Sequence, residues 1–271
     1  MKKIGVLVSC LFLVLLVGCT KSEQKGSDQW SRIKKEKKVI VGLDDTFAPM
    51  GFKEKNGKIV GFDVDLARAT FKRYGIKVDF KSIDWDVKEK ELENQTIDLI
   101  WNGYSKNEQR EKVQLFSEPY MRNDQVLVVA RKSGINSFEQ MKGKNLGTQR
   151  GSASYDTLIN QPKVLKIYIN KEIVLYDEFN SGFLDLEAGR VDGLLVDKVF
   201  AKYYLNQASK LKKYRLIEGG FKSEDFAVGA RKSDKKLTAK INESLNELHK
   251  NGEFQKISKK WFGDDVWPKK G

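Results

Sequence analysis

Cysteine and histidine are nearly absent from this 271-residue sequence, and their scarcity excludes several kinds of chemistry. There are two cysteines, Cys10 and Cys19, and both lie close to the N-terminus. The only histidine, His249, falls in a helical pattern and is expected on a helix surface. Disulfides, thiol catalysis and cysteine-based metal sites are therefore excluded, and a Ser-His-Asp triad has no basis. We expect no metal and no cofactor.

Long hydrophobic runs are also lacking, and the run at the N-terminus is too short for a good membrane span. Residues 4–17 are mostly apolar, follow two lysines, and fit a signal peptide. The run closes with Leu-Val-Gly before Cys19, which resembles the bacterial lipobox. That resemblance implies a signal peptide over residues 1–18, cleavage before Cys19, and a lipid such as palmitate on its thiol. An ordinary signal peptide and an uncleaved anchor are the alternatives.

Motifs for nucleic acids and nucleotides are missing as well. The formal net charge is +13, but no stripe of interleaved basic and aromatic residues accompanies it. We therefore expect no nucleic-acid partner and interpret the excess lysine as a solvated surface near an anionic cell envelope. No Gly-x-x-x-x-Gly-Lys phosphate loop occurs. Polar residues follow Cys19, and residues 19–36 are predicted to form a lipid-anchored tether.

Alternating strand and helix patterns in the first half of the chain predict a parallel sheet with right-handed crossovers. Runs typical of strands occur at Val39–Leu43, Lys77–Ile83 and Ile97–Trp101. Because the carboxyl ends of parallel strands share one edge of the sheet, the loops after these strands are expected to meet there. These loops contain Asp44, Phe47, Trp85, Gly103 and Ser105.

The third of these strands leads into the stretch 98–110, around which the first half of the chain is organised. The chain turns at Gly103, shows the hydroxyl group of Ser105, and continues as a polar helical segment that carries Arg110. Free backbone N–H groups at such an edge favour anions, and a guanidinium fork matches a carboxylate. We interpret this stretch as a clamp for a small carboxylate ligand; a surface turn with a solvated arginine is the alternative.

The strand and helix pattern restarts after the apolar strand Gln125–Ala130 and predicts a second lobe. The similar strand Asp225–Arg231 is interpreted, together with Gln125–Ala130, as the pair of crossovers between the lobes. The first lobe (lobe 1) is therefore predicted to span positions 37–121 and 226–271, and the second lobe (lobe 2) positions 122–225. A long amphipathic helix near the C-terminus is expected to pack onto lobe 1. The strands expected in lobe 2 are Asn145–Gln149, Ile173–Tyr176 and Val191–Val196, the last followed by Asp197.

These stretches resemble the extracytoplasmic solute-binding proteins of ABC importers for polar amino acids, of the glutamine- and histidine-binding type. The resemblance implies an α/β, two-lobed fold of the type II periplasmic-binding-protein kind. In that fold each lobe holds a mixed, mostly parallel sheet flanked by helices, and the lobes close on the ligand like a clamshell. The matching segments are the Val39 strand with Asp44 to Pro49, Gly61 to Ala67, Ile97 to Ile100, Gly103 to Ser105 with Arg110, Phe116 to Tyr120, Gly189 to Gly193 with Asp197, and Gly252 to Gly263.

The resemblance implies that two buried protein groups of opposite charge pair with the α-carboxylate and the α-ammonium of an amino acid. Arg110 pairs with the α-carboxylate, helped by donors at Ser105 and Ser152. Asp197 takes the α-ammonium, together with the carbonyl group of Gly103. The structural alternatives are a solvated arginine for Arg110 and a helix N-cap for Asp197.

The side chain of the ligand is expected between Phe47 and Trp85, with Asp44 at its polar end. Aromatic faces suit the aliphatic or cationic part of such a ligand. Core packing for Trp85 and a turn role for Asp44 are the alternatives. Two further residues, Gln149 and Arg150, are expected near the wall of the second lobe. A purely structural role is equally open for Gln149, Arg150 and Asn102.

The leading hypothesis is an extracytoplasmic, membrane-tethered and monomeric receptor that captures a polar L-amino acid. It would deliver this ligand to an ABC permease with its ATPase subunits, and contacts to both lobes would drive closure. An enzyme on the same fold, similar to cyclic-acid dehydratases or cell-wall lytic enzymes, is a second hypothesis, with Asp44, Glu118 and Glu178 as candidate acid–base groups. A ligand-sensing ectodomain would need a transmembrane helix after the lobes, and none is expected before Gly271. A cationic side chain, an amide and cystine all remain open as the ligand.

Overall fold

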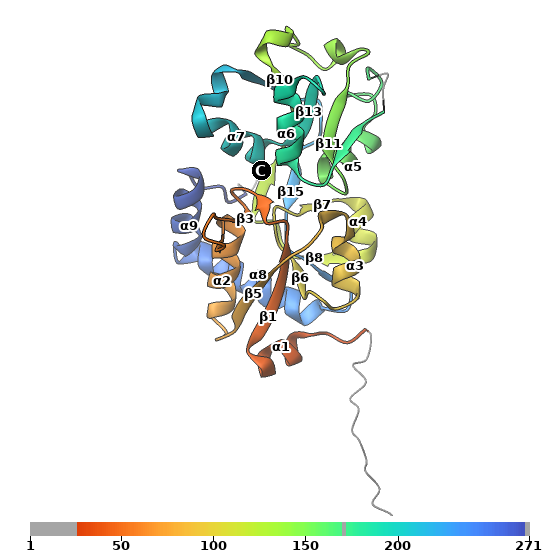
Figure 1. Cartoon of the computed structure of the whole chain (residues 1–271). Helices are drawn as coiled ribbons and strands as arrows, with labels where there is room; N and C mark the ends of the chain where they lie inside the picture. Colours follow the sequence, from red (N-terminus) through yellow and green to blue (C-terminus); the bar gives the residue numbers. More distant parts are fainter. Residues whose placement is uncertain (1–25, 170–171, 269–271) are drawn as a thin grey trace, which may run out of the picture.

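The computed structural model describes residues 26–169 and 172–268, which form two lobes stacked one on the other (Figure 1). The first lobe is built on a mixed sheet in the order β5 (Lys77–Ser82), β1 (Lys38–Leu43), β6 (Leu99–Ile100), β16 (Gly229–Arg231) and β8 (Gln114–Phe116). β1 is parallel to β5 and β6, whereas β16 is antiparallel to β6 and β8. The loops after β1, β5 and β6 therefore lie at one edge of this sheet, which faces the second lobe.

Helices cover both faces of the first sheet. The apolar face of α8 is formed by Leu237, Ile241, Leu245 and Leu248, spaced as on one side of a helix, and all four are at most 1% exposed. α8 packs on α2 and β8, so the predicted packing of the C-terminal helix onto lobe 1 is confirmed. The helices of this lobe are α1 (Trp30–Glu36), α2 (Phe62–Lys72), α3 (Lys88–Glu93), α4 (Glu108–Val113), α8 (Lys235–Lys250) and α9 (Glu253–Phe262), and the 3-10 turn η1 (Trp85–Val87) precedes α3.

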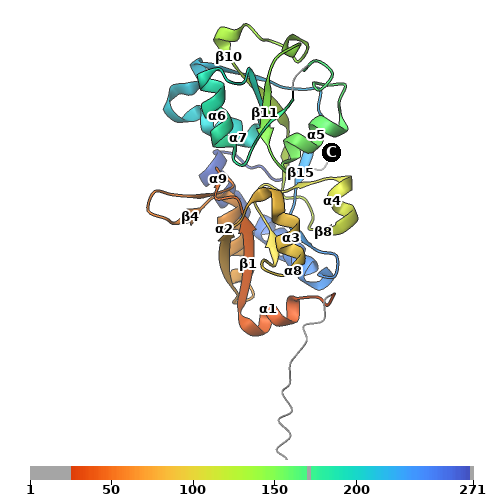
Figure 2. The same ribbon diagram turned by 45° about the vertical axis from the view of Figure 1, so that its right-hand side comes forward.

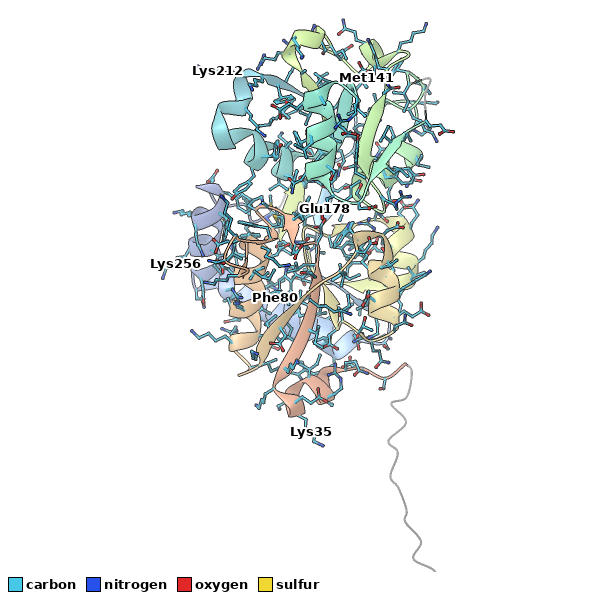
Figure 3. The ribbon with its side chains drawn as sticks, viewed as in Figure 1. Lys35, Phe80, Met141, Glu178, Lys212 and Lys256 are labelled. Carbon is cyan, nitrogen blue, oxygen red and sulfur yellow. The ribbon has the colours of Figure 1, made fainter. Side chains whose placement is uncertain are left out.

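Helix α1 corrects one expectation about the N-terminal region. The tether predicted over residues 19–36 overlaps this helix, in which Trp30 and Ile33 are buried in the core. Trp30 meets the ring of Tyr74 edge-on, with 5.0 Å between the ring centroids. The exposed lysines of α1, such as Lys35, point away from the lobe (Figure 3). The prediction of a tether is therefore wrong for residues 30–36, and residues 1–25, with the expected signal peptide and Cys19, lie outside the described residues.

The second lobe repeats the architecture with a sheet of its own. Its strands run in the order β12 (Val174–Tyr176), β11 (Leu146–Gln149), β13 (Gly193–Asp197), β10 (Gln125–Ala130) and β14 (Tyr214–Ile217). β11 is parallel to β12 and β13, whereas β10 is antiparallel to its two neighbours. The helices are α5 (Ala153–Asn160), α6 (Phe179–Ala188) and α7 (Lys198–Asn206), with shorter 3-10 turns η2 (Arg131–Ser133), η3 (Glu139–Met141) and η4 (Gln207–Lys212).

The strands that join the lobes differ from those predicted. Gln125–Ala130 is not a crossover, because all of it pairs with β13 and β14 inside the second lobe. The connection is made by β9 (Met121–Asn123) and β15 (Glu224–Phe226), which pair with each other in a small sheet with β7 (Ser105–Lys106). The predicted strand 225–231 is split, since β15 belongs to this connection and β16 to the first sheet. Apolar content alone did not separate a buried central strand from a connecting one.

A small antiparallel arm extends from the first lobe (Figure 2). It consists of β2 (Thr46–Phe47), β3 (Gly51–Lys53) and β4 (Ile59–Val60), and Gly57 supplies the positive φ of +83° in the turn between β3 and β4. The N–H of Lys53 in this arm donates to the carbonyl oxygen of Asp45, in the loop after β1, at 2.8 Å. Among the described residues, no helix is long and apolar enough to cross a membrane.

Candidate functional site

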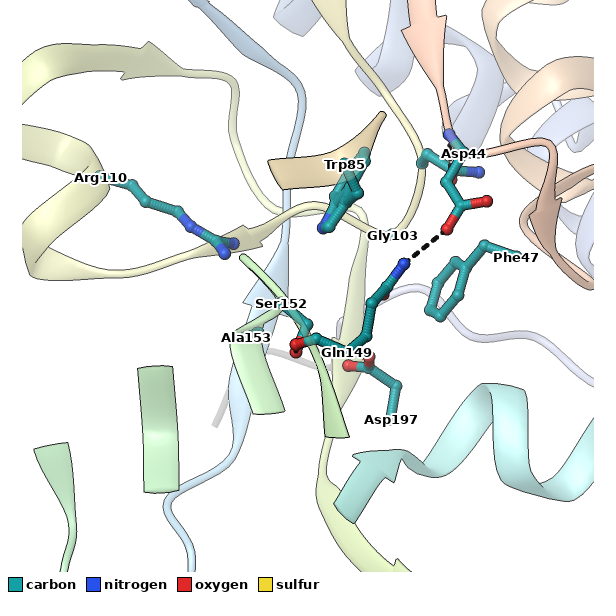
Figure 4. Close-up of a pocket in the computed structure, with 10 residues that line it drawn as sticks. Asp44, Phe47, Trp85, Gly103, Arg110, Gln149, Ser152, Ala153 and Asp197 are labelled. Carbon is teal, nitrogen blue, oxygen red and sulfur yellow. Dashed lines mark hydrogen bonds between the residues drawn. The ribbon is translucent and has the colours of Figure 1, made fainter. Parts of the chain in front are cut away.

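A pocket lies between the lobes at the carboxyl edge of the first sheet, where the sequence predicted the loops to meet. Its wall includes seven of the eight predicted ligand-binding residues, and only Ser105 is absent from it. Three residues that were not predicted as ligand contacts, Asn102, Gln149 and Ala153, complete the wall (Figure 4). The full lining is Asp44, Phe47, Trp85, Asn102, Gly103, Arg110, Gln149, Ser152, Ala153 and Asp197.

Arg110 is buried and tightly held at one end of the pocket. Its helix α4 begins after Asn107, whose side-chain oxygen accepts a hydrogen bond from the Arg110 N–H at 2.9 Å. The guanidinium donates to the carbonyl oxygen of Ser105 at 2.9 Å and to Asp156 of the second lobe at 3.0 Å. It also lies over the ring of Tyr104, 4.6 Å from the ring centroid. Arg110 is therefore not a solvated surface arginine.

Ser105 does not line the pocket; it contacts Arg110, which does. Its carbonyl oxygen holds Arg110, whereas its Oγ is buried and has no hydrogen-bond partner among the described residues. The second predicted serine, Ser152, does line the pocket and caps α5, where its Oγ accepts the N–H of Tyr155 at 3.2 Å. The start of α5 therefore faces the same space as Arg110, which suits an anionic group.

Asp197 ends β13 and is the only acidic residue that the second lobe contributes to the described lining of the pocket. Its Oδ1 accepts hydrogen bonds from the side-chain amides of Asn123 at 2.6 Å and Gln125 at 2.9 Å. Burial, and then the charge of Glu224, raise its pKa to about 7. The N–H of Val199 at the start of α7 bonds to Asn123, so Asp197 is not needed there as a cap. A buried carboxylate with neutral partners is suited to receive a cation.

Asp44 lies at the end of the pocket opposite Arg110, on the loop after β1. Thr46 donates to Oδ1 through its N–H at 2.9 Å and its hydroxyl at 2.6 Å. The Gln149 amide of the second lobe donates to Oδ2 at 2.8 Å and to the carbonyl oxygen of Asp177 at 2.9 Å. Burial raises the pKa of Asp44, and the hydrogen bonds from Thr46 and Gln149 oppose that rise. Asn102 fixes the loop by accepting the N–H of Asp44 at 3.1 Å.

Two aromatic side chains of the first lobe border the pocket. Phe47 is 5% exposed and stacks on Phe200 of the second lobe, with centroids 5.3 Å apart and planes at 6°. Trp85 meets Tyr104 edge-on, with 5.7 Å between the ring centroids, and is therefore held in a fixed orientation. Position 103 has no room for a side chain, because a Cβ there would lie 2.7 Å from the ring of Phe47.

Sequence reasoning assigned Arg150 to the second-lobe wall, but the structure does not place it in the pocket. Arg150 is exposed and lies 3.7 Å from Asp177. Ala153 was missed because it lines the pocket only by its position at the start of α5, which no side-chain signal marks. Among the described residues, no group of three or more His, Cys, Asp or Glu side chains is arranged to hold a metal ion.

The fold and this site define a two-lobed binding protein that holds a small ligand between its lobes. The chain belongs to the bacterial extracellular solute-binding proteins, family 3, whose family model matches residues 39–264. The family and the relatives described below are extracellular or periplasmic solute-binding proteins, so the chain is a solute-binding protein and not an enzyme. The predicted class and fold are confirmed.

Known relatives match this chain over most of their length. A solved ABC uptake transporter substrate-binding protein from Streptococcus pneumoniae, with bound histidine, is 48% identical, with a TM-score of 0.88 over 89% of this chain and 99% of that chain. The L-cystine-binding protein TcyJ of Escherichia coli is 28% identical over 96% of both chains. The histidine-binding periplasmic protein of Escherichia coli is 31% identical over 84% of this chain and 89% of its own length.

Proposed function

We propose that the pocket binds the α-carboxylate and α-ammonium groups of a polar L-amino acid, which the protein delivers to an ABC permease. The observation that carries this proposal is the pair Arg110 and Asp197, two buried groups of opposite charge from different lobes that line one pocket. A zwitterion supplies an ammonium group for Asp197, whose described hydrogen-bond donors are neutral amides, and a carboxylate for Arg110, whose ionic partner among the described residues is Asp156. Contacts to both lobes make the ligand stabilise the closed form.

The far end of the pocket favours a side chain with nitrogen donors. Asp44 Oδ2 accepts only the Gln149 amide in the described contacts and so keeps a lone pair for a ligand donor. Glu178 lies at the boundary between the lobes (Figure 3), and burial and the charge of Asp44 raise its pKa. This acidic surrounding suits imidazole or guanidinium groups. Histidine is therefore the first ligand to test, and arginine the second.

The binding test is thermal unfolding of the chain from Thr20 onward, freed of co-purified ligand, against the standard amino acids and cystine. A ligand that binds only the folded state stabilises it by about 2.7 kcal/mol at 100 times its Kd. One or two amino acids should raise the Tm, and Arg110→Ala should abolish the shift. Arg73→Ala is the matched control, because Arg73 is exposed, lies at the end of α2 and is outside the pocket. If no amino acid shifts the Tm of the unmodified protein, the proposal is wrong.

The proposal includes a lipid anchor at Cys19, supported by the lipobox-like sequence that ends there. In cells, Cys19→Ser should move the protein from the membrane fraction to the soluble or secreted fraction. Cys10→Ser is the control, because Cys10 lies within the segment expected to be removed. Retention of Cys19→Ser at the membrane to the same extent as the unmodified protein would contradict the anchor, while leaving ligand binding unaffected.

A further inference from the structure

Lys88 is a buried lysine at the boundary between the lobes. It is the first residue of α3 and is 2% exposed, whereas Lys90 on the same helix is exposed. Its Nζ donates to the carbonyl oxygen of Trp85 at 3.0 Å and lies 3.0 Å from a carboxylate oxygen of Glu89. Burying an ammonium group is costly, so a lysine kept there calls for a compensating contact.

Glu89 of the same helix supplies the opposite charge, and the second lobe supplies a further oxygen. Lys88 Nζ donates to the carbonyl oxygen of Gly151 at 2.9 Å, and Arg110 donates to the same oxygen at 3.3 Å. Gly151 lies in the turn between β11 and α5, directly before Ser152 and Ala153, which line the pocket. Figure 2 shows α5 beside α4 at this side of the boundary, in agreement with the bond between Arg110 and Asp156.

The fit around this turn is close. Gly151 has a φ of +65°, and a Cβ there would lie 3.0 Å from the backbone Cα of Asp86, the residue after Trp85. The turn of the second lobe is thus seated directly against η1 and α3 of the first. Opening the lobes would separate the Gly151 carbonyl from Lys88 and expose the ammonium group to water.

We propose that Lys88 is a positioning residue that docks the Gly151 turn of the second lobe onto the first and thereby completes the carboxylate end of the pocket. This inference rests on the proposed amino-acid site. Lys88 does not line the pocket and does not touch the ligand; it acts through Gly151, and so through Ser152 and Ala153. Since the contact forms only when the lobes meet, Lys88 retains the bound ligand by slowing reopening, and affects the first encounter little.

The test replaces Lys88 by methionine, which has a similar length and no charge, and uses Lys90→Met as the matched control. Dissociation of histidine, or of whichever amino acid the binding screen identifies, is followed by stopped-flow tryptophan fluorescence. We expect Lys88→Met to raise koff about tenfold, the size of a lost hydrogen bond to a charged group, with kon changed less than threefold. The Tm without ligand should be unchanged or higher, because an apolar side chain replaces a buried charge. Lys90→Met should match the unmodified protein.

A second variant keeps the inference testable if Lys88→Met folds poorly. Lys88→Gln retains a donor but no charge, and its koff should lie between those of the unmodified protein and Lys88→Met. An unchanged koff in both variants would overturn the proposed role of Lys88. If the Tm without ligand also falls, Lys88 serves only the stability of the fold. Absence of binding in the unmodified protein would instead contradict the proposed function.

Discussion

The Asp44 carboxylate of the first lobe accepts a hydrogen bond from the Gln149 amide of the second, with 2.8 Å between Oδ2 and Nε2. The two lobes therefore touch through the end of the pocket where the ligand's side chain is proposed to lie. An amide N–H donor already occupies part of the position that an imidazole or guanidinium N–H would take. A ligand donor must either share Oδ2 with Gln149 or displace it, so we expect the Asp44 carboxylate to discriminate between side chains.

Asp44→Asn should weaken binding of arginine by tenfold to a hundredfold, because a neutral amide cannot form an ion pair with the guanidinium. This corresponds to a loss of about 1.5–3 kcal/mol of binding free energy. Binding of glutamine, where measurable, should change less than threefold. Titration calorimetry with both ligands measures the ratio. Asp45→Asn is the matched control, since Asp45 pairs with Lys53 and Ser82 and does not line the pocket. Equal losses of affinity for both ligands would show that Asp44 maintains the conformation of its loop and does not discriminate between ligand side chains.

Asp197 predicts a pH dependence of binding. Its carboxyl group has a pKa of about 7 without ligand, above the ordinary value of 3.8, chiefly because of burial. Pairing with an α-ammonium requires the ionised form, so protonation competes with binding as the pH falls below 7. Affinity should then fall by up to tenfold per pH unit, which corresponds to about 1.4 kcal/mol of binding free energy. Above pH 7.5 the affinity should level off, because the carboxyl group is then mostly ionised.

The measurement needs a ligand whose side chain does not titrate between pH 5 and 8.5, such as arginine. Asp63 also has a pKa raised to about 7 by burial, but it does not line the pocket and bonds to the Gly103 N–H and the Tyr120 hydroxyl. Asp197→Asn separates the two groups: it should bind weakly at every pH and show a flat profile. A profile in the variant as steep as in the unmodified protein would assign the dependence to another buried acid, either Asp63 or Asp44, whose pKa is also raised by burial.

The position of most pocket residues could be predicted because a parallel sheet gathers successive loops at one edge. That single rule placed Asp44, Trp85 and Gly103 together before any contact was known. Arg110 followed from the same reasoning, since α4 begins shortly after β7 at that edge. Composition could not say which lobe-2 residue meets Asp44, and so the bridging role of Gln149 needed the structure.

Lys88 shows why other features were not predictable. The stretch from Lys88 to Glu93 is charged at every position except Leu92, a pattern typical of a solvated helix, and nothing in it distinguishes Lys88 from Lys90. Burial of Lys88 depends on the second lobe, whose contact at Gly151 comes much later in the chain. The tether was predicted wrongly for a similar reason. The segment is short and rich in lysine, and its composition does not show that Trp30 and Ile33 are buried in the core of the first lobe.

Helix α1 therefore carries a stability prediction. Ile33→Ala removes a fully buried side chain from the core of the first lobe and should lower the free energy of unfolding by about 2–4 kcal/mol. Lys34→Ala, at the exposed neighbouring position, should have an effect of at most about 0.5 kcal/mol. Urea denaturation followed by tryptophan fluorescence gives both values. If Ile33→Ala cost no more than Lys34→Ala, the interpretation of residues 30–36 as a tether would be restored.

Gly103 tests the geometry of the pocket itself. Its φ is +57°, and an added Cβ would lie 2.7 Å from Phe47 and 3.2 Å from Phe226. Gly103→Ala therefore combines backbone strain of about 1–2 kcal/mol with a collision that pushes Phe47 into the ligand's place. Gly57→Ala is the matched control, because Gly57 also has a positive φ, +83°, but nothing within 4 Å of its Cβ position. Both variants should lose a similar amount of stability from strain, and only Gly103→Ala should lose ligand affinity, by at least tenfold. Equal affinities in the two variants would show that the pocket tolerates a side chain at Gly103 and that Phe47 does not define the space available to the ligand.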